Sequence, residues 1–189
     1  YYNLIIQDNK SDYVTRAALR AAELERQGRN YPRAVRNYQL ALTQAKSKTD
    51  QVSAQLGLMD TYLAIPKLDS AAYVAREVIA VGNVLPGAQN RAQLALGKVA
   101  YAKGDYKTAQ QEFERTIALA KDVSGAEANY LIGEGQYKQK KYKESIATLL
   151  RFNEQFEGFE YWKGKAFILV ADNNLALGEL AQARAVLNS

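Results

Sequence analysis

The sequence predicts an all-α fold, an α-solenoid in which antiparallel pairs of short helices stack in a row. Three observations predict it. Apolar residues recur at spacings of three and four along most of the chain, as they do along one side of a helix. Short turn signals interrupt these stretches. The whole pattern repeats every 36 to 38 residues, a period typical of helical repeat arrays. A single pair leaves an apolar face uncovered, so each copy needs its neighbours.

The stretch from Arg91 to Phe113 is the cleanest copy of the unit. Gly104 is expected to end its first helix, because glycine adopts a positive φ angle without steric cost. Asp105 is the predicted N-cap of the second helix, where its carboxylate can accept a hydrogen bond from a free backbone N–H. The apolar sides of the two helices are formed by Leu94, Leu96, Gly97, Ala100 and Tyr101 before the turn and by Tyr106, Ala109, Phe113 and Ile117 after it.

Two sets of marker residues carry this unit through the chain, one set in the first helix of each copy and one in the second. Within each set, successive markers are separated by 36 to 38 residues. Two independent sets that keep one period indicate a tandem repeat rather than a chance similarity. The first-helix markers are Ala21, Met59, Gly97, Gly133 and Ala171, and the second-helix markers are Ala34, Ala71, Ala109, Ser145 and Ala183.

The copies follow one another in a single array. Pro32 is tolerated in the first turn of a helix, and Pro86-Gly87 marks a loop before copy three. The turn of copy one, Gly28 to Tyr31, is expected to contain one additional residue. The predicted helices are 12–27 and 31–45 in copy one, 51–64 and 68–81 in copy two, one on each side of Gly104 in copy three, 125–139 and 142–155 in copy four, and a fifth copy that starts near Phe159 and turns at Gly178.

The array is expected to be a fragment of a longer one. The chain begins with Tyr1-Tyr2 without a methionine, and it stops at Ser189 partway through a predicted second helix. Both ends should therefore expose apolar surface. The predicted units are the end of a preceding repeat at 1–10, four repeats at 12–48, 49–85, 87–122 and 124–157, and a truncated repeat at 159–189.

The residues Leu96-Gly97, Gly104, Tyr106, Ala109 and Phe113 resemble the signature of the tetratricopeptide repeat (TPR). The resemblance covers nearly the whole chain, although the early tryptophan and the closing proline of the family signature are missing from the copies. It implies a right-handed superhelix in which the first helix of each pair lines the concave surface. It also implies that the chain binds other proteins or peptides.

Composition excludes several kinds of site. The chain has no cysteine and no histidine, which removes disulfides, thiolate metal sites, the commonest general base and the commonest zinc ligand. No signal peptide is visible, and no run approaches the roughly twenty apolar residues that span a bilayer. The formal charge is +5, and the first copy carries most of the excess through Arg16, Arg20, Arg26, Arg29, Arg33 and Arg36. This excess could favour an acidic partner, or it could be a solvated helix surface.

No constellation of residues indicates catalysis. Gly133-Glu134-Gly135 lacks the strand and the further glycines of a phosphate-binding loop, and carboxylate pairs such as Glu112 and Glu114 lie on a polar helix face. The lysines around the turn of copy four are better explained by a polar turn than by a nucleic-acid patch. We therefore predict that the chain is not an enzyme and has no cofactor and no metal.

The first helices of copies two to five each present an apolar, a charged and an apolar or aromatic residue at steps of four and three. On the concave surface that the resemblance implies, these would form two apolar strips beside a charged row, which is a groove for an extended peptide or a helix. Alternatively, part of each triplet packs between neighbouring helices and the charges pair with one another. The residues are Leu56, Asp60, Leu63, Leu94, Lys98, Tyr101, Tyr130, Glu134, Tyr137, Ile168, Asp172 and Leu175, with Tyr101, Tyr130 and Tyr137 as the strongest anchors.

The predicted function is that of a non-catalytic scaffold that binds a protein or peptide on its concave face. Two alternatives stay open: a structural spacer that self-associates end to end through Leu4, Ile5 and Leu187, and a regulatory sensor arm of a larger protein. RNA binding is disfavoured by the mild charge, and membrane insertion is not expected. The family's clamp for a C-terminal carboxylate is not matched. The resemblance and the basic, cysteine-free composition favour the bacterial periplasm or cell envelope, with the cytoplasm as the alternative.

Overall fold

The computed structural model describes residue 2 and residues 13–188. The predicted end of a preceding repeat (1–10) lies, apart from Tyr2, outside the described residues, as do Leu4 and Ile5. The chain divides into two compact units, Tyr1–Val99 and Ala100–Ser189. The described parts of both units are helical and contain no strand. The predicted all-α fold is confirmed, whereas the assignment of the copies to one continuous array stays a prediction.

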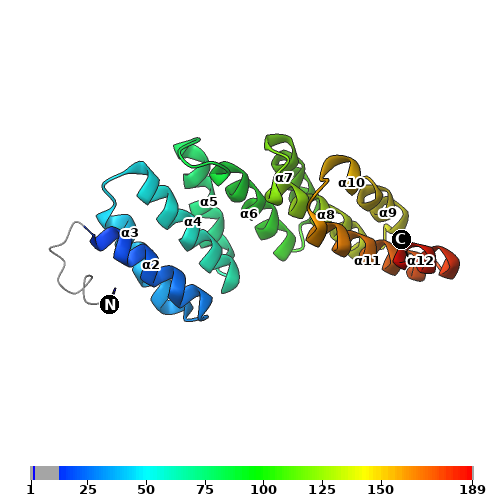
Figure 1. Ribbon diagram of the computed structural model, residues 1–189, viewed down its shortest axis with the longest axis horizontal. Helices are drawn as coiled ribbons and strands as arrows, with labels where there is room; N and C mark the ends of the chain where they lie inside the picture. Colours follow the sequence, from blue (N-terminus) through cyan, green and yellow to red (C-terminus); the bar gives the residue numbers. More distant parts are fainter. Residues whose placement is uncertain (1, 3–12, 189) are drawn as a thin grey trace. The chain divides into compact units, whose positions relative to one another are not determined.

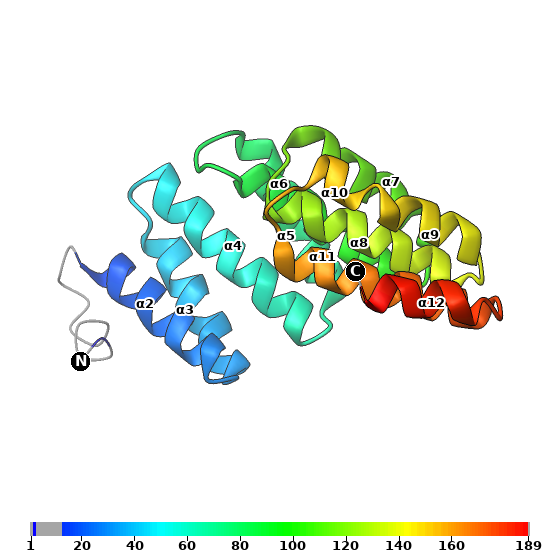
Figure 2. The same cartoon turned by 45° about the vertical axis from the view of Figure 1, so that its right-hand side comes forward.

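Both units are built from helix pairs (Figures 1 and 2). In the N-terminal unit, α4 packs against α2, α3 and α5, and in the C-terminal unit α8 packs against α7, α9 and α11. The first helices α4 and α8 thus each contact their own second helix and a neighbouring pair, as expected for a helical repeat. The helices are α2 (Val14–Gln27), α3 (Tyr31–Gln44), α4 (Lys48–Ala64), α5 (Leu68–Val81), α6 (Ala88–Ala102), α7 (Tyr106–Leu119), α8 (Val123–Lys138), α9 (Tyr142–Leu150), α10 (Phe152–Gln155), α11 (Glu160–Ala176) and α12 (Leu180–Leu187).

The turn inside each pair has the same length and the same closing hydrogen bond, and in four of the five pairs it has the same left-handed middle residue. Three residues separate the two helices in every pair, so the prediction of an additional residue in copy one is wrong. The middle residue is left-handed where it is Arg29, Gly104, Lys140 or Gly178, with φ between 60° and 79°. The third residue closes a Schellman-type bond to a carbonyl five residues back. These bonds, 2.7 to 3.0 Å long, run from Asn30 to Glu25, Lys67 to Tyr62, Asp105 to Ala100, Lys141 to Gln136 and Glu179 to Asn174.

Side-chain caps fix where several helices begin. The predicted N-cap is confirmed, because Asp105 accepts a 3.0 Å hydrogen bond from the backbone N–H of Thr108. Ser47 likewise caps α4 by accepting from the N–H of Asp50 at 3.1 Å. This cap starts α4 at Lys48, three residues before the predicted start at residue 51 and within the predicted connection between helices 31–45 and 51–64.

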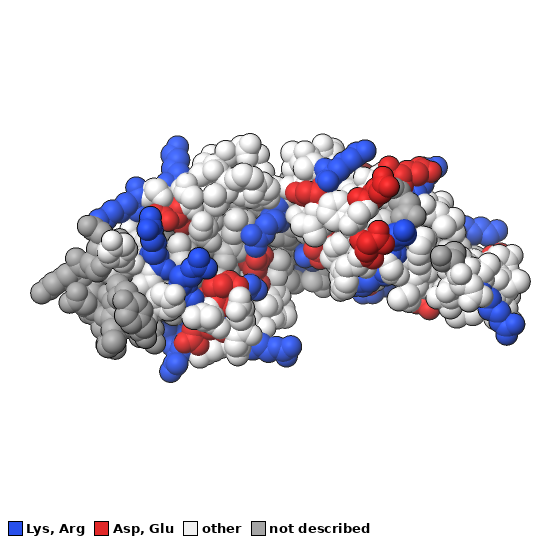
Figure 3. All heavy atoms as spheres, viewed as in Figure 1, with Lys and Arg blue, Asp and Glu red and all other residues white. Residues whose placement is uncertain are grey.

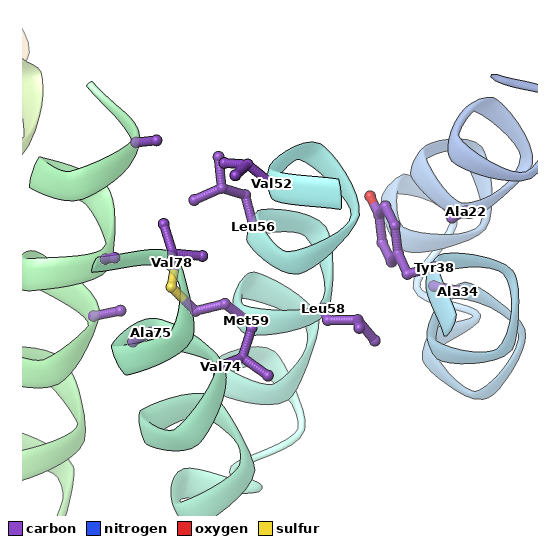
Figure 4. Packing of buried hydrophobic residues seen from close by; sticks show 13 residues of the cluster. Ala22, Ala34, Tyr38, Val52, Leu56, Leu58, Met59, Val74, Ala75 and Val78 are labelled. Atoms are coloured by element: carbon purple, nitrogen blue, oxygen red, sulfur yellow. The ribbon is translucent and has the colours of Figure 1, made fainter. Parts of the chain in front are cut away.

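Small residues form the contact between the two helices of each pair. The second-helix markers Ala34, Ala71, Ala109, Ser145 and Ala183 are all at most 2% exposed. In the N-terminal unit, Met59 points toward Ala75 and Val78 of α5, whereas Leu58 points to the α2–α3 pair (Figure 4). One helix, α4, therefore packs both inside its own pair and against the preceding one.

The C-terminal unit has an aromatic core. Phe113, Phe152 and Phe156 are each at most 2% exposed. The predicted helix 142–155 is broken at Arg151, and α10 follows as a separate turn. After the break, Phe152 and Phe156 lie side by side, with ring centroids 5.4 Å apart. Phe156 packs against Gly125 of α8, where a Cβ would lie 2.9 Å from the Phe156 ring.

Gly133 allows α8 and α9 to approach closely, as the sequence pattern indicated. A Cβ at this position would lie 2.6 Å from both Cγ and Cδ2 of Leu149. The backbone carbonyl of Gly133 also accepts a 2.8 Å hydrogen bond from the Ser145 hydroxyl, which in turn accepts one of 2.9 Å from the Asn173 amide. A buried polar chain thus ties three helices together in addition to apolar packing.

Gly133→Ala tests this close approach. We expect a loss of about 1–3 kcal/mol in the free energy of unfolding, because the added methyl overpacks against Leu149. Gly164→Ala is the matched control: it is also a helical glycine, but no atom lies within 4 Å of its added Cβ. Helix propensity alone should make the control more stable by about 0.5–1 kcal/mol. Urea denaturation of both variants measures this, and equal effects of the same sign would contradict the packing.

Lys140→Gly tests the turn. Lys140 holds a φ of 61°, a conformation that costs a residue with a Cβ more than it costs glycine. We expect the variant to be more stable by about 0.5–1 kcal/mol, and Gly104→Ala, at the equivalent position, to be less stable by about 1 kcal/mol. Thermal denaturation measures both changes, and Lys140→Ala should be near neutral. Destabilisation by Lys140→Gly would mean that the lysine side chain, and not the backbone, maintains the turn.

Candidate functional site

A polar groove lies between the first helices α2 and α4 of the N-terminal unit. Two adjoining pockets form it, with volumes of about 440 and 370 Å³, and they share Glu23, Tyr38 and Ser53. Basic side chains with interspersed acidic ones lie over α2 and the adjacent part of α4 (Figure 3). We call this the N-terminal groove. Its lining consists of Arg16, Leu19, Arg20, Glu23, Arg26, Tyr38, Ser53, Leu56, Gly57, Asp60, Leu85, Pro86 and Arg91.

Tyr38 reaches this groove from the second helix α3 because Gly57 leaves room for its ring. A Cβ on Gly57 would lie 2.1 Å from Cε1 of Tyr38, so no other residue fits beside the ring in this position. The side chain is 3% exposed, and its hydroxyl donates a 2.8 Å hydrogen bond to Oε2 of Glu23 on α2. Tyr38 therefore connects three helices at the bottom of the groove.

Glu23 is the centre of a hydrogen-bonded network. Arg26 binds both of its carboxylate oxygens, through Nη2 at 2.8 Å and Nε at 3.1 Å, and Gln27 donates a further bond of 2.8 Å. The hydrogen bonds from Arg26 lower the pKa of Glu23 from 4.5 to about 2, with smaller contributions from Tyr38 and Gln27. The same contacts raise the pKa of Arg26, and burial raises the pKa of Tyr38. At neutral pH, Glu23 is therefore ionised, and its carboxylate accepts hydrogen bonds from Arg26, Gln27 and Tyr38.

The other carboxylate of the groove, Asp60, is also paired. Its Oδ2 accepts a hydrogen bond from Nη2 of Arg91, at the start of α6. Arg16 and Arg20, by contrast, are exposed and have no ion-pair partner among the described residues. Around the N-terminal groove four arginines face two carboxylates, so the surface keeps a positive charge of about two.

The C-terminal unit contains a second polar and aromatic cluster. The hydroxyls of Tyr101 and Tyr130 donate to the two carboxylate oxygens of Glu134, Tyr130 at 3.0 Å. The pKa values of both tyrosines are raised, primarily by burial. Lys138 lies over the Tyr101 ring at 4.7 Å, and Lys165 lies over the Tyr130 ring at 4.4 Å. Three of the twelve predicted residues are thus brought into direct contact here.

The other predicted residues differ widely in exposure. Leu56 and Leu94 are buried, at 7% and 5% exposure, and Tyr130 is 7% exposed, so most of each side chain packs inside the fold. Ile168 and Leu175, in contrast, are 58% and 50% exposed on α11. The remaining members are partly buried or exposed: Leu63 packs against the core of the N-terminal unit, Tyr137 packs on Tyr142 with centroids 5.5 Å apart, Lys98 is half-buried, and Asp172 is exposed.

Leu19, Glu23 and Arg26 were missed because the first copy was aligned one residue out of register. These residues have the same four-and-three spacing as Leu56, Asp60 and Leu63, exactly one repeat of 37 residues earlier. Ala22, which is fully buried, is the equivalent of Met59, whereas the sequence pattern had pointed to Ala21. The equal turn lengths of the copies are the signal that would have corrected the register.

No group of three acidic residues close enough to hold a metal ion occurs among residues 2 and 13–188. In the same part of the chain, no helix is long and apolar enough to cross a bilayer. The carboxylates of Glu23, Asp60 and Glu134 instead contact tyrosine or arginine side chains.

The pKa of Glu23 makes the stability of the N-terminal unit depend on pH. Because folding lowers this pKa, ionised Glu23 stabilises the fold above pH 4.5, and the contribution is lost as the pH falls toward 2. We expect the difference in urea midpoint between the wild type and Glu23→Gln to be largest at pH 6–7 and to shrink by pH 2–3. Glu77→Gln, on an exposed position of α5, is the control. A pH-independent difference for Glu23→Gln would contradict the network.

Comparison with known proteins supports the fold. No family model and no curated protein sequence matches the chain. Among solved structures, a tetratricopeptide repeat protein from Parabacteroides merdae has a TM-score of 0.70 at 13% identity, over 99% of this chain and 67% of that one. YrrB, described as a TPR protein with an unusual peptide-binding site, has a TM-score of 0.60 at 19% identity, over 99% and 89%. MamA protein has a TM-score of 0.65 at 18% identity, over 94% and 90%. The chain therefore has the fold of the tetratricopeptide-repeat proteins.

Proposed function

We propose that the chain is a non-catalytic scaffold that binds a peptide or a partner protein along the faces of its first helices. The N-terminal groove is the observation that carries this proposal. It is open, it combines apolar and charged side chains, and its two pockets fall in the size range of ligand sites. Its buried members Tyr38 and Leu56 supply a rigid floor, and its rim supplies charged groups that can select a partner.

The arrangement of charges favours binding over catalysis. Glu23, Asp60 and Glu134 are the acidic residues nearest to the two clusters, and each is engaged by arginine or tyrosine. A general base needs a free carboxylate or amine near a reacting group, and these residues are instead used to hold neighbouring helices. The peptide-binding site named for YrrB gives a precedent within this fold, although a fold alone does not determine a partner.

The Tyr101–Glu134–Tyr130 cluster is the second surface that we include in the proposal. The lysines above the rings expose positive charge next to aromatic faces, a combination that suits protein contacts. Exposed Ile168 and Leu175 on α11 extend the apolar area of the C-terminal unit. Self-association remains the alternative: Leu187 on α12 is 61% exposed.

Ser53→Tyr tests the groove without disturbing the core. Ser53 lines both pockets, and its hydroxyl donates only to the Thr49 carbonyl of its own helix. Peptides are first selected from a random phage-displayed library on the wild-type chain, without regard to their charge. We expect most of them to bind Ser53→Tyr at least tenfold more weakly, because the new ring fills the groove.

Gln39→Tyr, which places the same ring on the exposed face of α3, is the control and should keep wild-type affinity. Isothermal titration calorimetry measures the affinities, and circular dichroism checks that both variants are folded. Selected peptides that bind Ser53→Tyr as well as the wild type would show that the groove is not the binding surface.

A further inference from the structure

Arg16 and Arg20 form a basic pair on the wall of the N-terminal groove, and neither has an ion-pair partner among residues 13–188. They lie one turn apart on α2, and both line the 370 Å³ pocket. Of the described residues that line this pocket, Glu23 alone has a carboxylate, and its two oxygens already accept hydrogen bonds from Arg26, Gln27 and Tyr38. Glu23 therefore has little capacity left to neutralise the pair, and the guanidinium groups are available to a ligand.

The position of this pair is unfavourable for the helix by itself. Arg16 is the third residue of α2, where the helix dipole favours negative charge, and the first turn contains no acidic residue. Arginines four residues apart also repel each other along a helix face. An anionic ligand would relieve both effects at once. An arginine in the first turn and a like-charge pair both disfavour the helix. Such local costs at the rim of a groove are typical of a binding site rather than of a solvated surface.

We propose that the N-terminal groove binds an acidic peptide segment in which carboxylates occupy alternate positions. Side chains one helical turn apart are separated by about 5–6 Å at Cβ, and alternate residues of an extended peptide lie about 7 Å apart on one face. Two carboxylates at this spacing can each pair with one guanidinium, Arg16 with the first and Arg20 with the second. Leu19 lies beside them in the same pocket and can contact apolar groups of the peptide.

An acidic peptide fits this groove better than a nucleic acid does. The excess of about two positive charges is confined to one helix, whereas nucleic-acid binding commonly uses a longer row of cations and exposed aromatic rings for base stacking. The one aromatic ring of the pocket belongs to Tyr38, which is 3% exposed and so cannot stack on a base. This proposal rests on the proposed function, since it assigns a class of partner to the same groove.

The test uses a fluorescein-labelled peptide in which glutamates alternate with serines, and a second peptide with glutamine in place of each glutamate. Fluorescence anisotropy measures the affinity of the wild-type chain for both. We expect the glutamate peptide to bind at least tenfold more tightly, with an affinity that falls as salt is added. Arg16→Gln/Arg20→Gln should reduce the affinity for the glutamate peptide at least tenfold.

The matched control is Arg29→Gln/Arg36→Gln, which removes the same charge from exposed positions of the same copy that line neither pocket. It should keep the affinity within about threefold, because only long-range electrostatics change. An equal loss in both double variants, no loss in either, or tighter binding of a labelled uridine decamer than of the glutamate peptide would overturn the proposal.

The outcome is separable from that of the Ser53→Tyr experiment. If library-selected peptides require the open groove but are neutral or basic, and the Arg16→Gln/Arg20→Gln variant binds them normally, the scaffold function stands and the acidic partner is excluded. If the selected peptides are acidic at alternate positions and lose binding in this variant, both proposals are supported.

Discussion

The close approach of the two helices in each pair is the constraint on which the rest of the structure depends. It requires a residue no larger than alanine or serine at one fixed place of every second helix, and Ala34, Ala71, Ala109, Ser145 and Ala183 meet this requirement with at most 2% exposure. The shared three-residue turn then fixes the register of the pair, because its left-handed residue and Schellman-type bond leave little freedom in how the chain re-enters the second helix. First helices such as α4 use one side for this contact and another for the preceding pair, and only the face that meets neither is free to vary.

The two candidate surfaces use that freedom in similar ways. In each, one carboxylate binds a tyrosine hydroxyl: Glu23 binds Tyr38, and Glu134 binds Tyr101 and Tyr130. The basic groups beside them make different contacts. Arg26 donates hydrogen bonds to Glu23, whereas Lys138 and Lys165 lie over aromatic rings. Partly buried polar networks of this kind make a surface rigid before any partner arrives, and rigidity reduces the entropic cost of binding.

The sequence predicted the fold well because the apolar spacing, the turn residues and the helix caps of a helical repeat are periodic and local. The marker spacing, Gly104 and Asp105 each correspond to a structural feature. The predictions failed where the decisive contact lies far away in the chain or in backbone geometry that side chains do not reveal. The left-handed position of the turn is occupied by Arg29 and Lys140 as well as by glycine. No single residue type therefore marks the turn, and its equal length in all copies could not be recognised from the sequence. The contact of Tyr38 with Gly57, the break at Arg151 and the contact of Phe156 with Gly125 depend on tertiary packing. The arginines of the first copy were visible in the sequence as a possible site for an acidic partner, but their position on a groove beside Glu23 and Tyr38 depends on tertiary packing.

The uniform turn has a consequence for how such a chain can change over time. The five turns that connect the paired helices have equal lengths and the same closing hydrogen bond, although their residues differ. Duplication or recombination that cuts at equivalent points of two hairpins would preserve the phase of everything downstream. A lineage could therefore exchange one inner helix face for another, and with it the recognised ligand, while the architecture stays the same.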